Sequence, residues 1–220
     1  MNSVLDRFDK IQADILENSK KTNIPIEIIA VSKTFPLEKI KPLIDRGHIH
    51  FGENKVQETE KKWKNIKNEK KSLKLHMLGR LQTNKAKKAV LIFDYIHSLD
   101  SKKLADNLKK SENETGRKLS YFIQVNFANE TQKSGIPISE AEFFYQYCKS
   151  KINLNVIGIM CFPPFDVDPE NYFKQAFQLN KKLGLKELSM GMSNDYLKAI
   201  NNGSTFVRVG SAIFGERNIT

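Results

Sequence analysis

Short runs rich in β-branched residues alternate with longer amphipathic segments along the whole chain, and this alternation limits the possible folds most strongly. It predicts parallel strands joined by crossover helices. Eight strand runs at this spacing favour a closed (β/α)8 TIM barrel with an extra N-terminal helix over an open doubly wound sheet. The predicted strands are 26–32, 48–51, 73–78, 93–98, 119–126, 154–160, 186–190 and 204–209. The predicted helices are about 2–21, 37–46, 54–67, 84–91, 101–111, 139–151, 169–183 and 194–202.

Length and composition fit one globular domain over residues 1–220, because no proline- or glycine-rich linker divides the chain. No stretch approaches the roughly 20 apolar residues of a membrane span, and the first residues lack the apolar run of a signal peptide. The only two cysteines, Cys148 and Cys161, cannot build a disulfide framework, and no zinc-ligand spacing occurs. We therefore expect a soluble cytoplasmic protein without a metal site, with a monomer as the default state.

The formal net charge is +11, from 36 Lys and Arg residues against 25 Asp and Glu residues. Such an excess attracts nucleic acids or phosphorylated ligands. Much of the excess is lysine scattered in pairs on predicted polar helix faces, and no aromatic-plus-basic stacking module occurs. We therefore interpret it mainly as a solvated lysine-rich surface and expect no specific nucleic-acid partner.

A barrel of this kind holds its chemistry at the carboxyl ends of its strands, and Lys33 follows the first, almost unbroken apolar strand. Partial desolvation there would favour the neutral amine that attacks an aldehyde. The alternative is a lysine that merely reaches into solvent past a strand end. Lys33 becomes a strong candidate only if its neighbours can hold a phosphorylated aldehyde.

The last two strand ends supply candidates for holding a phosphate. Gly210 and Ser211 follow the eighth strand, where the glycine lets the backbone approach an anion closely. Ser193 could cap a helix beginning near Asn194 and direct its N–H groups toward the phosphate, or it could be a helix cap alone. Arg208 sits near the end of a β-forming strand, where an inward guanidinium needs a ligand or a structural salt bridge.

Other polar residues carry weaker signals. We interpret the four histidines as hydrogen-bonded strand residues without metal spacing, Trp63 as a packing residue, and Cys161 as a buried hydrophobe. Glu53 and Asn54 could face the barrel mouth, although Gly-Glu-Asn also resembles a helix entry. The histidines are His48, His50, His76 and His97.

Several ordered motifs together resemble the pyridoxal phosphate homeostasis proteins, single-domain barrels related to the N-terminal domain of alanine racemase. The resemblance covers about residues 28–217. The motifs are AVSKTFP (30–36), FGENKVQE (51–58), HMLGRLQTNK (76–85), IHSLD (96–100), QVNFANETQKSG (124–135), GIMCFPP (158–164), LSMGMSNDYLKAINNGST (188–205) and VRVGSAIFGER (207–217).

The resemblance implies that Lys33 carries pyridoxal 5′-phosphate (PLP) as a Schiff base. It also implies that Ser193 holds the phosphate together with the backbone of Gly210 and Ser211. Arg208 would face the pyridine nitrogen and disfavour its protonation, which makes the ring a poorer electron sink. Asn54 is implied as a mouth residue near the cofactor.

Two positions depart from the family pattern, Arg80 in HMLGRLQ and the pair Cys161-Phe162 in GIMCFPP. We expect Arg80 to change the charge at the mouth and the pair to change packing only. Neither departure falls on the lysine or on the phosphate loops.

The choice between carrier and enzyme depends on a second base. Racemases use two bases on opposite faces of the substrate, and in the related racemases one comes from a further C-terminal domain. We expect no such domain after residue 220. The resemblance therefore implies a protein that binds PLP, controls intracellular vitamin B6 and has no robust catalysis of its own. PLP-dependent apoenzymes are the expected recipients.

Three rival functions remain open from sequence alone. A low-activity PLP-dependent racemase or lyase would need a Tyr, Lys or Cys beside the cofactor. A phosphosugar isomerase or aldolase would share the phosphate loops and add a strong acid–base pair. An RNA-binding barrel would show steep salt dependence and no lysine adduct.

Overall fold

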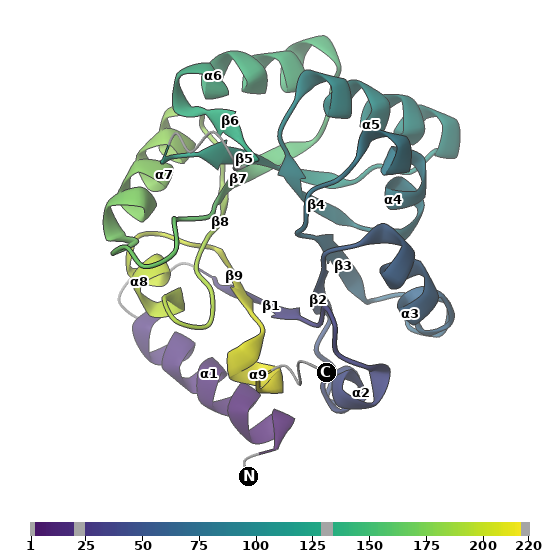
Figure 1. Ribbon diagram of the computed structural model, residues 1–220, viewed down its shortest axis with the longest axis vertical. Coiled ribbons are helices and arrows are strands. Elements are labelled where there is room, and N and C mark those ends of the chain that lie inside the picture. Colours follow the sequence, from purple (N-terminus) through teal and green to yellow (C-terminus); the bar gives the residue numbers. More distant parts are fainter. Residues whose placement is uncertain (1–2, 20–24, 129–133, 217–220) are drawn as a thin grey trace.

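The computed structural model describes residues 3–19, 25–128 and 134–216. It forms a closed barrel of eight parallel strands surrounded by helices (Figure 1), so the predicted TIM barrel and its extra N-terminal helix are confirmed. Parts of three sequence features lie outside the described residues: the ends of the predicted 2–21 helix, positions 129–133 of the 124–135 motif, and Arg217.

The barrel strands follow one another around the ring, and the pairing of β4 with β5 closes it. β6 is a short additional strand that pairs with the end of β5. The strands are β1 (Glu27–Val31), β2 (His50–Glu53), β3 (Lys74–Met77), β4 (Tyr95–Leu99), β5 (Ser120–Asn126), β6 (Ile136–Pro137), β7 (Val156–Cys161), β8 (Glu187–Ser189) and β9 (Phe206–Val209).

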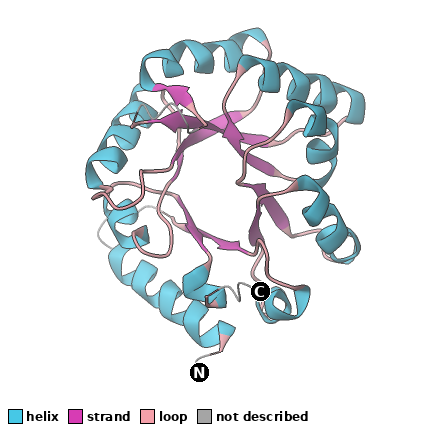
Figure 2. Cartoon of the chain, viewed as in Figure 1, coloured by secondary structure: helices cyan, strands magenta, loops and turns pink. Residues whose placement is uncertain are grey.

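The helices form an outer ring around these strands (Figure 2). They are α1 (Val4–Ser19), α2 (Leu37–Asp45), α3 (Val56–Glu69), α4 (Ala86–Ile92), α5 (Lys102–Thr115), α6 (Ile138–Gln146), α7 (Glu170–Lys182), α8 (Tyr196–Asn201) and α9 (Ser211–Phe214). A 3₁₀ turn (Thr83–Lys85) precedes α4, and a π turn (Tyr147–Lys151) continues α6.

Local signals explain where helix α5 begins and ends. Ser101 caps its start, since the Ser101 hydroxyl accepts a hydrogen bond from the Leu104 N–H at 3.3 Å. Gly116 ends the helix in the left-handed conformation, with φ of 69°, which glycine adopts without steric strain. The predicted range 101–111 therefore began one residue early, at the cap residue, and stopped four residues before Thr115.

Among the strands, the second has the largest boundary error. The predicted range 48–51 is shifted by two residues relative to β2, which runs from His50 to Glu53. The chain reaches β2 through a turn at Gly47, whose φ is 94°, and His48 lies between that turn and the strand. Gly52 and Glu53 look unlike strand residues in sequence, yet both lie in the parallel ladder with β3.

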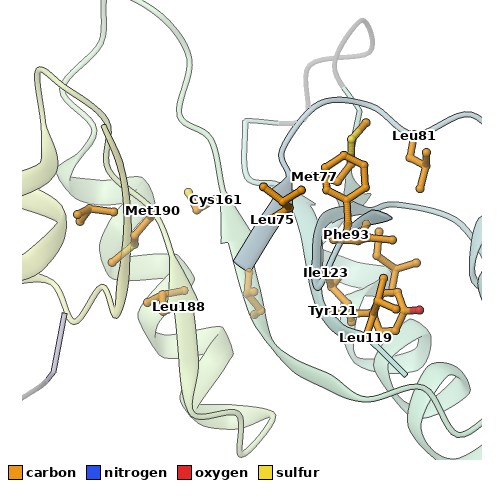
Figure 3. Packing of buried hydrophobic residues seen from close by; sticks show 14 of the residues in the cluster. Leu75, Met77, Leu81, Phe93, Leu119, Tyr121, Ile123, Cys161, Leu188 and Met190 are labelled. Carbon is orange, nitrogen blue, oxygen red and sulfur yellow. The ribbon is translucent and has the colours of Figure 1, made fainter. Parts of the chain in front are cut away.

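The hydrophobic core has two parts. The larger part fills the space between the strands and the helices (Figure 3), and a smaller cluster fills the inside of the barrel. The inner cluster contains Ile29, Phe122, Met160 and Phe206. Because both faces of the strands are buried, a strand such as EIIAV of β1 is apolar almost throughout. Among the described residues, no helix is long and apolar enough to cross a membrane.

Candidate functional site

A cavity of about 990 Å³ opens at the carboxyl ends of the barrel strands. All six residues predicted for the site line this cavity, although they come from four separate parts of the sequence. They are Lys33, Asn54, Ser193, Arg208, Gly210 and Ser211. The structure therefore brings together at one mouth every residue singled out from the sequence as a candidate ligand contact.

Lys33 lies in a tight turn directly after β1. The Phe35 N–H donates to the Ser32 carbonyl at 3.1 Å, and Thr34 adopts a left-handed φ of 68°. A β-branched residue rarely takes this conformation, and such strain is common at functional sites. The turn directs the half-buried Lys33 into the cavity lining.

Ser32 anchors this turn to the neighbouring strand and helix. Its N–H donates to the Gly52 carbonyl at 2.9 Å, and its hydroxyl donates to Glu53 Oε1 at 2.7 Å. Lys62 Nζ donates to the Ser32 carbonyl at 2.9 Å. The residue before Lys33 is therefore held by β2 and α3, which fixes where the Lys33 side chain begins.

Glu53 does not face the mouth, which was one of its two predicted positions. Its side chain is 1% exposed, and Oε1 also accepts hydrogen bonds from Lys62 Nζ and Trp63 Nε1, both at 2.9 Å. Trp63 is itself buried, so the prediction that it packs is confirmed. Asn54, the next residue along, reaches the cavity instead.

Gly79 shows why the FGEN and HMLGR segments lie so close together. A Cβ atom at position 79 would sit 2.4 Å from the Asn54 carbonyl oxygen, so only glycine fits there without displacing the backbone. Arg80 follows as an exposed residue of the cavity lining. The predicted effect of Arg80 on the mouth therefore has a structural basis, because its guanidinium group adds positive charge at the rim.

Ser193 has a different role from the predicted cap near Asn194. The following helix, α8, begins only at Tyr196. The Ser193 hydroxyl instead accepts hydrogen bonds from the N–H groups of Gly210 at 3.3 Å and Ala212 at 3.2 Å. Ser193 thus joins the β8 loop to the β9 loop, and the two predicted phosphate-binding segments form one unit.

Gly210 lies against the end of β1 at the bottom of this unit. An added Cβ atom would come within 3.3 Å of both the Val31 Cβ atom and the Val31 carbonyl oxygen. The absence of a side chain at Gly210 thus lets the β9 loop lie directly on the end of β1, two residues before Lys33. The hydroxyl and N–H groups gathered here are the donor set that a phosphate group requires.

Arg208 is buried, with 6% of its surface exposed, and it lines the inner wall of the cavity. Nη1 donates to Ser189 Oγ at 2.8 Å, and Nη2 donates to the Cys161 carbonyl at 2.9 Å. Burial lowers the pKa of Arg208 to about 10, so the guanidinium stays charged at neutral pH. Among the described residues, no carboxylate forms a salt bridge with it.

Three of the four histidines are buried strand residues as predicted, whereas the prediction is wrong for His48, which lies before β2 and is only partly buried. His76 and His97 are fully buried, and His50 nearly so, and hydrogen bonds satisfy the ring nitrogens that face one another. Cys161 is a buried free thiol whose pKa is raised to about 12 by burial, so its interpretation as a buried hydrophobe is confirmed. No cluster of metal-ligating side chains occurs in the described part of the chain.

Sequence analysis missed the apolar side of the mouth. Phe162, Phe165 and Val167 lie on the loop between β7 and α7, and all three are exposed while lining the cavity. Lys198 of α8 also lines it and forms an ion pair with Asp168 of the same loop at 2.9 Å. The sequence offers one signal for this loop, the prolines at 163, 164 and 169. Because proline lacks a backbone N–H, these residues do not extend β7 or the interior of α7.

Residues 8–218 match the family described as "Alanine racemase, N-terminal domain". The chain is 35% identical to the pyridoxal phosphate homeostasis protein of Aquifex aeolicus, over 99% of this chain and 96% of that protein. It is also 35% identical to the protein of the same name from Haemophilus influenzae, over 95% and 92% of the two chains.

Among solved structures, the chain resembles PipY of Synechococcus elongatus PCC7942 with PLP bound. The TM-score is 0.81 at 34% identity, over 91% of this chain and all of PipY. Fold, motif order and full-length similarity thus agree. The chain belongs to the pyridoxal phosphate homeostasis proteins, within the family of the alanine racemase N-terminal domain.

Proposed function

We propose that this chain binds PLP at the mouth of the barrel, holds it as a Schiff base on Lys33 and thereby controls the level of free cofactor. One observation carries the proposal: a single cavity is lined by a lysine amine, a set of hydroxyl and N–H donors, and a buried arginine. Residues 1–220 would act as one cofactor-binding domain. The relatives named for pyridoxal phosphate homeostasis and the PLP-bound PipY structure support the same function.

The residues fit the groups of the cofactor one by one. The Lys33 amine would condense with the aldehyde and release water, which is a reversible reaction suited to storage and release. Ser193 and the backbone of Gly210 and Ser211 would bind the phosphate. Arg208 would donate a hydrogen bond to the ring nitrogen, and Asn54 would line the rim.

The lining of the cavity supports a carrier rather than a racemase or lyase. Among its described residues there is no tyrosine, histidine or cysteine. Lys198 is the other lysine of the lining, and it is exposed and paired with Asp168. The lining also contains the carboxylates of Asp166 and Asp195, and Asp195 Oδ1 accepts a hydrogen bond from the Met192 N–H. Racemases use two bases on opposite faces of the substrate; because the lining lacks a tyrosine, histidine or cysteine and its second lysine is ion-paired, we propose that turnover of amino acids is weak or absent. Cytoplasmic localisation, a monomeric state and transfer to apoenzymes stay predictions.

Absorption spectroscopy followed by borohydride reduction and peptide mass mapping tests this function. Incubation with PLP should give a visible band that disappears on reduction, with the added mass on Lys33. Lys33→Ala should lose the reducible adduct, whereas Lys198→Ala, the matched change in the same cavity, should keep it. A wild-type protein without any band after incubation would exclude PLP binding and favour a phosphosugar enzyme. An adduct retained in Lys33→Ala would show that another lysine is used.

A further inference from the structure

The inside of the barrel contains a continuous line of hydrogen bonds that begins at Arg208. Arg208 Nη1 lies 2.8 Å from Ser189 Oγ, and Ser189 Oγ lies 2.9 Å from His97 Nδ1. Ser189 is the last residue of β8 and His97 belongs to β4, so this step crosses the barrel from one wall to the other. Both residues are fully buried.

The line continues from His97 toward the opposite end of the barrel. His97 Nε2 lies 2.9 Å from His76 Nδ1, and His76 Nε2 lies 2.8 Å from His50 Nδ1. His50 Nε2 then faces the Glu27 carboxylate at 3.5 Å, where Glu27 is half exposed at the start of β1. We call Ser189, His97, His76 and His50 the histidine chain.

The strand register explains how three histidines distant in sequence meet. His76 is level with Gly52, two residues beyond His50, and His97 is two residues beyond Tyr95, which is level with His76. Each step to the next strand therefore moves up by two residues. Two residues is the repeat that returns a side chain to the same face of a strand, so all three rings point into the barrel.

Aromatic packing holds the rings in the orientation that the chain requires. His76 stacks on Tyr95 with ring centroids 4.3 Å apart, and His97 stacks on Phe122 at 4.2 Å. Phe206 contacts the rings of all three histidines at 5.9–6.4 Å. A ring fixed in this way presents each nitrogen to one partner only.

The Ser189 end of the chain indicates the direction of its hydrogen bonds. A guanidinium only donates, so Ser189 Oγ accepts from Arg208. Ser189 is fully buried, and among the described residues His97 Nδ1 is the remaining partner of its hydroxyl, so donation to Nδ1 is the arrangement that leaves no buried hydroxyl hydrogen unpaired. This direction gives neutral rings protonated at Nε2 and unprotonated at Nδ1, and the 3.5 Å contact of His50 Nε2 with the Glu27 carboxylate is compatible with it. Burial lowers the pKa of His50, His76 and His97, which keeps the rings neutral.

We infer that the histidine chain is a positioning device for Arg208: with its hydrogen held by His97, the Ser189 hydroxyl stays where it accepts from Nη1, and this aims the remaining guanidinium donors at the ring nitrogen of PLP. The inference rests on the proposed function, because it concerns the same cavity. It extends the site from the mouth of the barrel to Glu27 at the opposite end. It assigns a shared role to residues that do not line the cavity.

The first test needs no cofactor. Nitrogen-15 NMR of the histidine-labelled protein at pH 7 should show His50, His76 and His97 neutral, with the proton on Nε2. A proton on Nδ1 of His76 or His97 would overturn the inferred direction and with it the proposal. This result stands whether or not the protein binds PLP, so it separates the inference from the proposed function.

The second test uses the protein loaded with PLP labelled with nitrogen-15 in the ring. His97→Leu should move the ring-nitrogen resonance toward that of a nitrogen without a hydrogen bond and should speed PLP release about tenfold. His97→Gln should restore both values, because an amide can accept from Ser189 and donate to His76. If His97→Leu does not fold, Ser189→Ala interrupts the same hydrogen-bonded chain by removing a single oxygen, and the same changes are expected.

His48→Gln is the matched control, because His48 is a neighbouring, partly buried histidine that lies outside the chain and bonds to the His50 carbonyl. In His48→Gln, the resonance of the PLP ring nitrogen and the rate of PLP release should equal those of the wild type. A folded His97→Leu or Ser189→Ala protein with wild-type values for both would overturn the proposal. Failure of the wild-type protein to load PLP would instead contradict the proposed function.

Discussion

Glu53 and Arg208 are both buried charges near the carboxyl ends of strands, yet their surroundings differ. The Oε1 atom of Glu53 accepts hydrogen bonds from three side chains, Ser32, Lys62 and Trp63. These partners join β1, β2 and α3 around the carboxylate. Glu53 is therefore part of the scaffold that places the neighbouring Lys33 turn.

Arg208 is only partly satisfied by its surroundings. A guanidinium carries five N–H donors, and among the described residues the Arg208 guanidinium donates only to Ser189 Oγ and the Cys161 carbonyl. It also lines the cavity. The comparison teaches that a buried charge surrounded by protein partners supports the fold, whereas a buried charge with donors left over at a cavity wall is prepared for a ligand.

Glu53→Ala should give the largest effect, on stability. It leaves the Lys62 ammonium and the Trp63 N–H without their buried acceptor, and breaking a buried ion pair in this way costs about 3–5 kcal/mol. Urea unfolding of the cofactor-free protein measures the loss. Glu58→Ala, which breaks an exposed pair with Lys55, is the control and should change stability by at most about 1 kcal/mol. A small loss in Glu53→Ala would remove the distinction between the two buried charges.

The histidines differ from Glu53 and Arg208, because burial favours their neutral form over the charged one. Burial lowers the pKa of His48 from 6.5 to about 4. Between these values the unfolded chain binds a proton that the folded chain does not, so stability falls as pH falls. His48 alone should reduce the free energy of unfolding by about 2 kcal/mol between pH 7 and pH 5. His48→Gln should flatten that dependence in urea titrations at the two pH values, and an unchanged slope would refute the assignment.

Arg208→Met should differ from Glu53→Ala: it should change the free energy of unfolding little and weaken PLP binding clearly. Methionine removes the desolvated cation while filling much of its volume, so the unfolding midpoint should move little. Losing one charge-assisted hydrogen bond should raise the dissociation constant for PLP about tenfold, measurable by equilibrium dialysis. Wild-type affinity in this variant would place Arg208 outside the binding site.

Ser193→Ala should have a smaller effect on stability than Glu53→Ala. Its hydroxyl accepts from the Gly210 and Ala212 N–H groups at the start of α9, and losing such a cap costs about 1 kcal/mol. We also expect weaker PLP binding, measured by the same dialysis experiment. Ser211→Ala changes a neighbouring hydroxyl that contributes no such cap, and it should leave stability nearly unchanged. An equal loss of stability in both variants would contradict the bridging role of Ser193.

Residues at strand ends were predictable from sequence because the barrel itself forces them together. Lys33 and Gly210 follow buried strands and Arg208 lies near the end of one, and the carboxyl ends of parallel strands meet on one face. The residue types then indicate the chemistry. This is why the six candidate residues, all of which line the same cavity, could be predicted without knowing the structure of the loops between them.

Contacts that depend on register or on loop shape could not be predicted in the same way. His50 and His97 are 47 positions apart in the sequence, and their link through His76 follows only from how far each strand is shifted against the next. The Ser193 bridge likewise required knowing that α8 starts late, at Tyr196, which leaves the hydroxyl available to the β9 loop. The left-handed turn at Thr34 has no sequence signal, since threonine normally avoids it.

The N-terminal helix gives the barrel a particular order of assembly. Figure 1 shows α1 lying beside α8 and α9, and Arg7 Nε donates to the Ile213 carbonyl, 206 residues away in the sequence. β1 likewise pairs with β9. β1 also pairs with β2 and α1 contacts α2, but during synthesis their contacts with the last elements can form only after those elements have been made. Contacts between such distant residues slow folding, so ring closure should be the late, rate-limiting step on the ribosome.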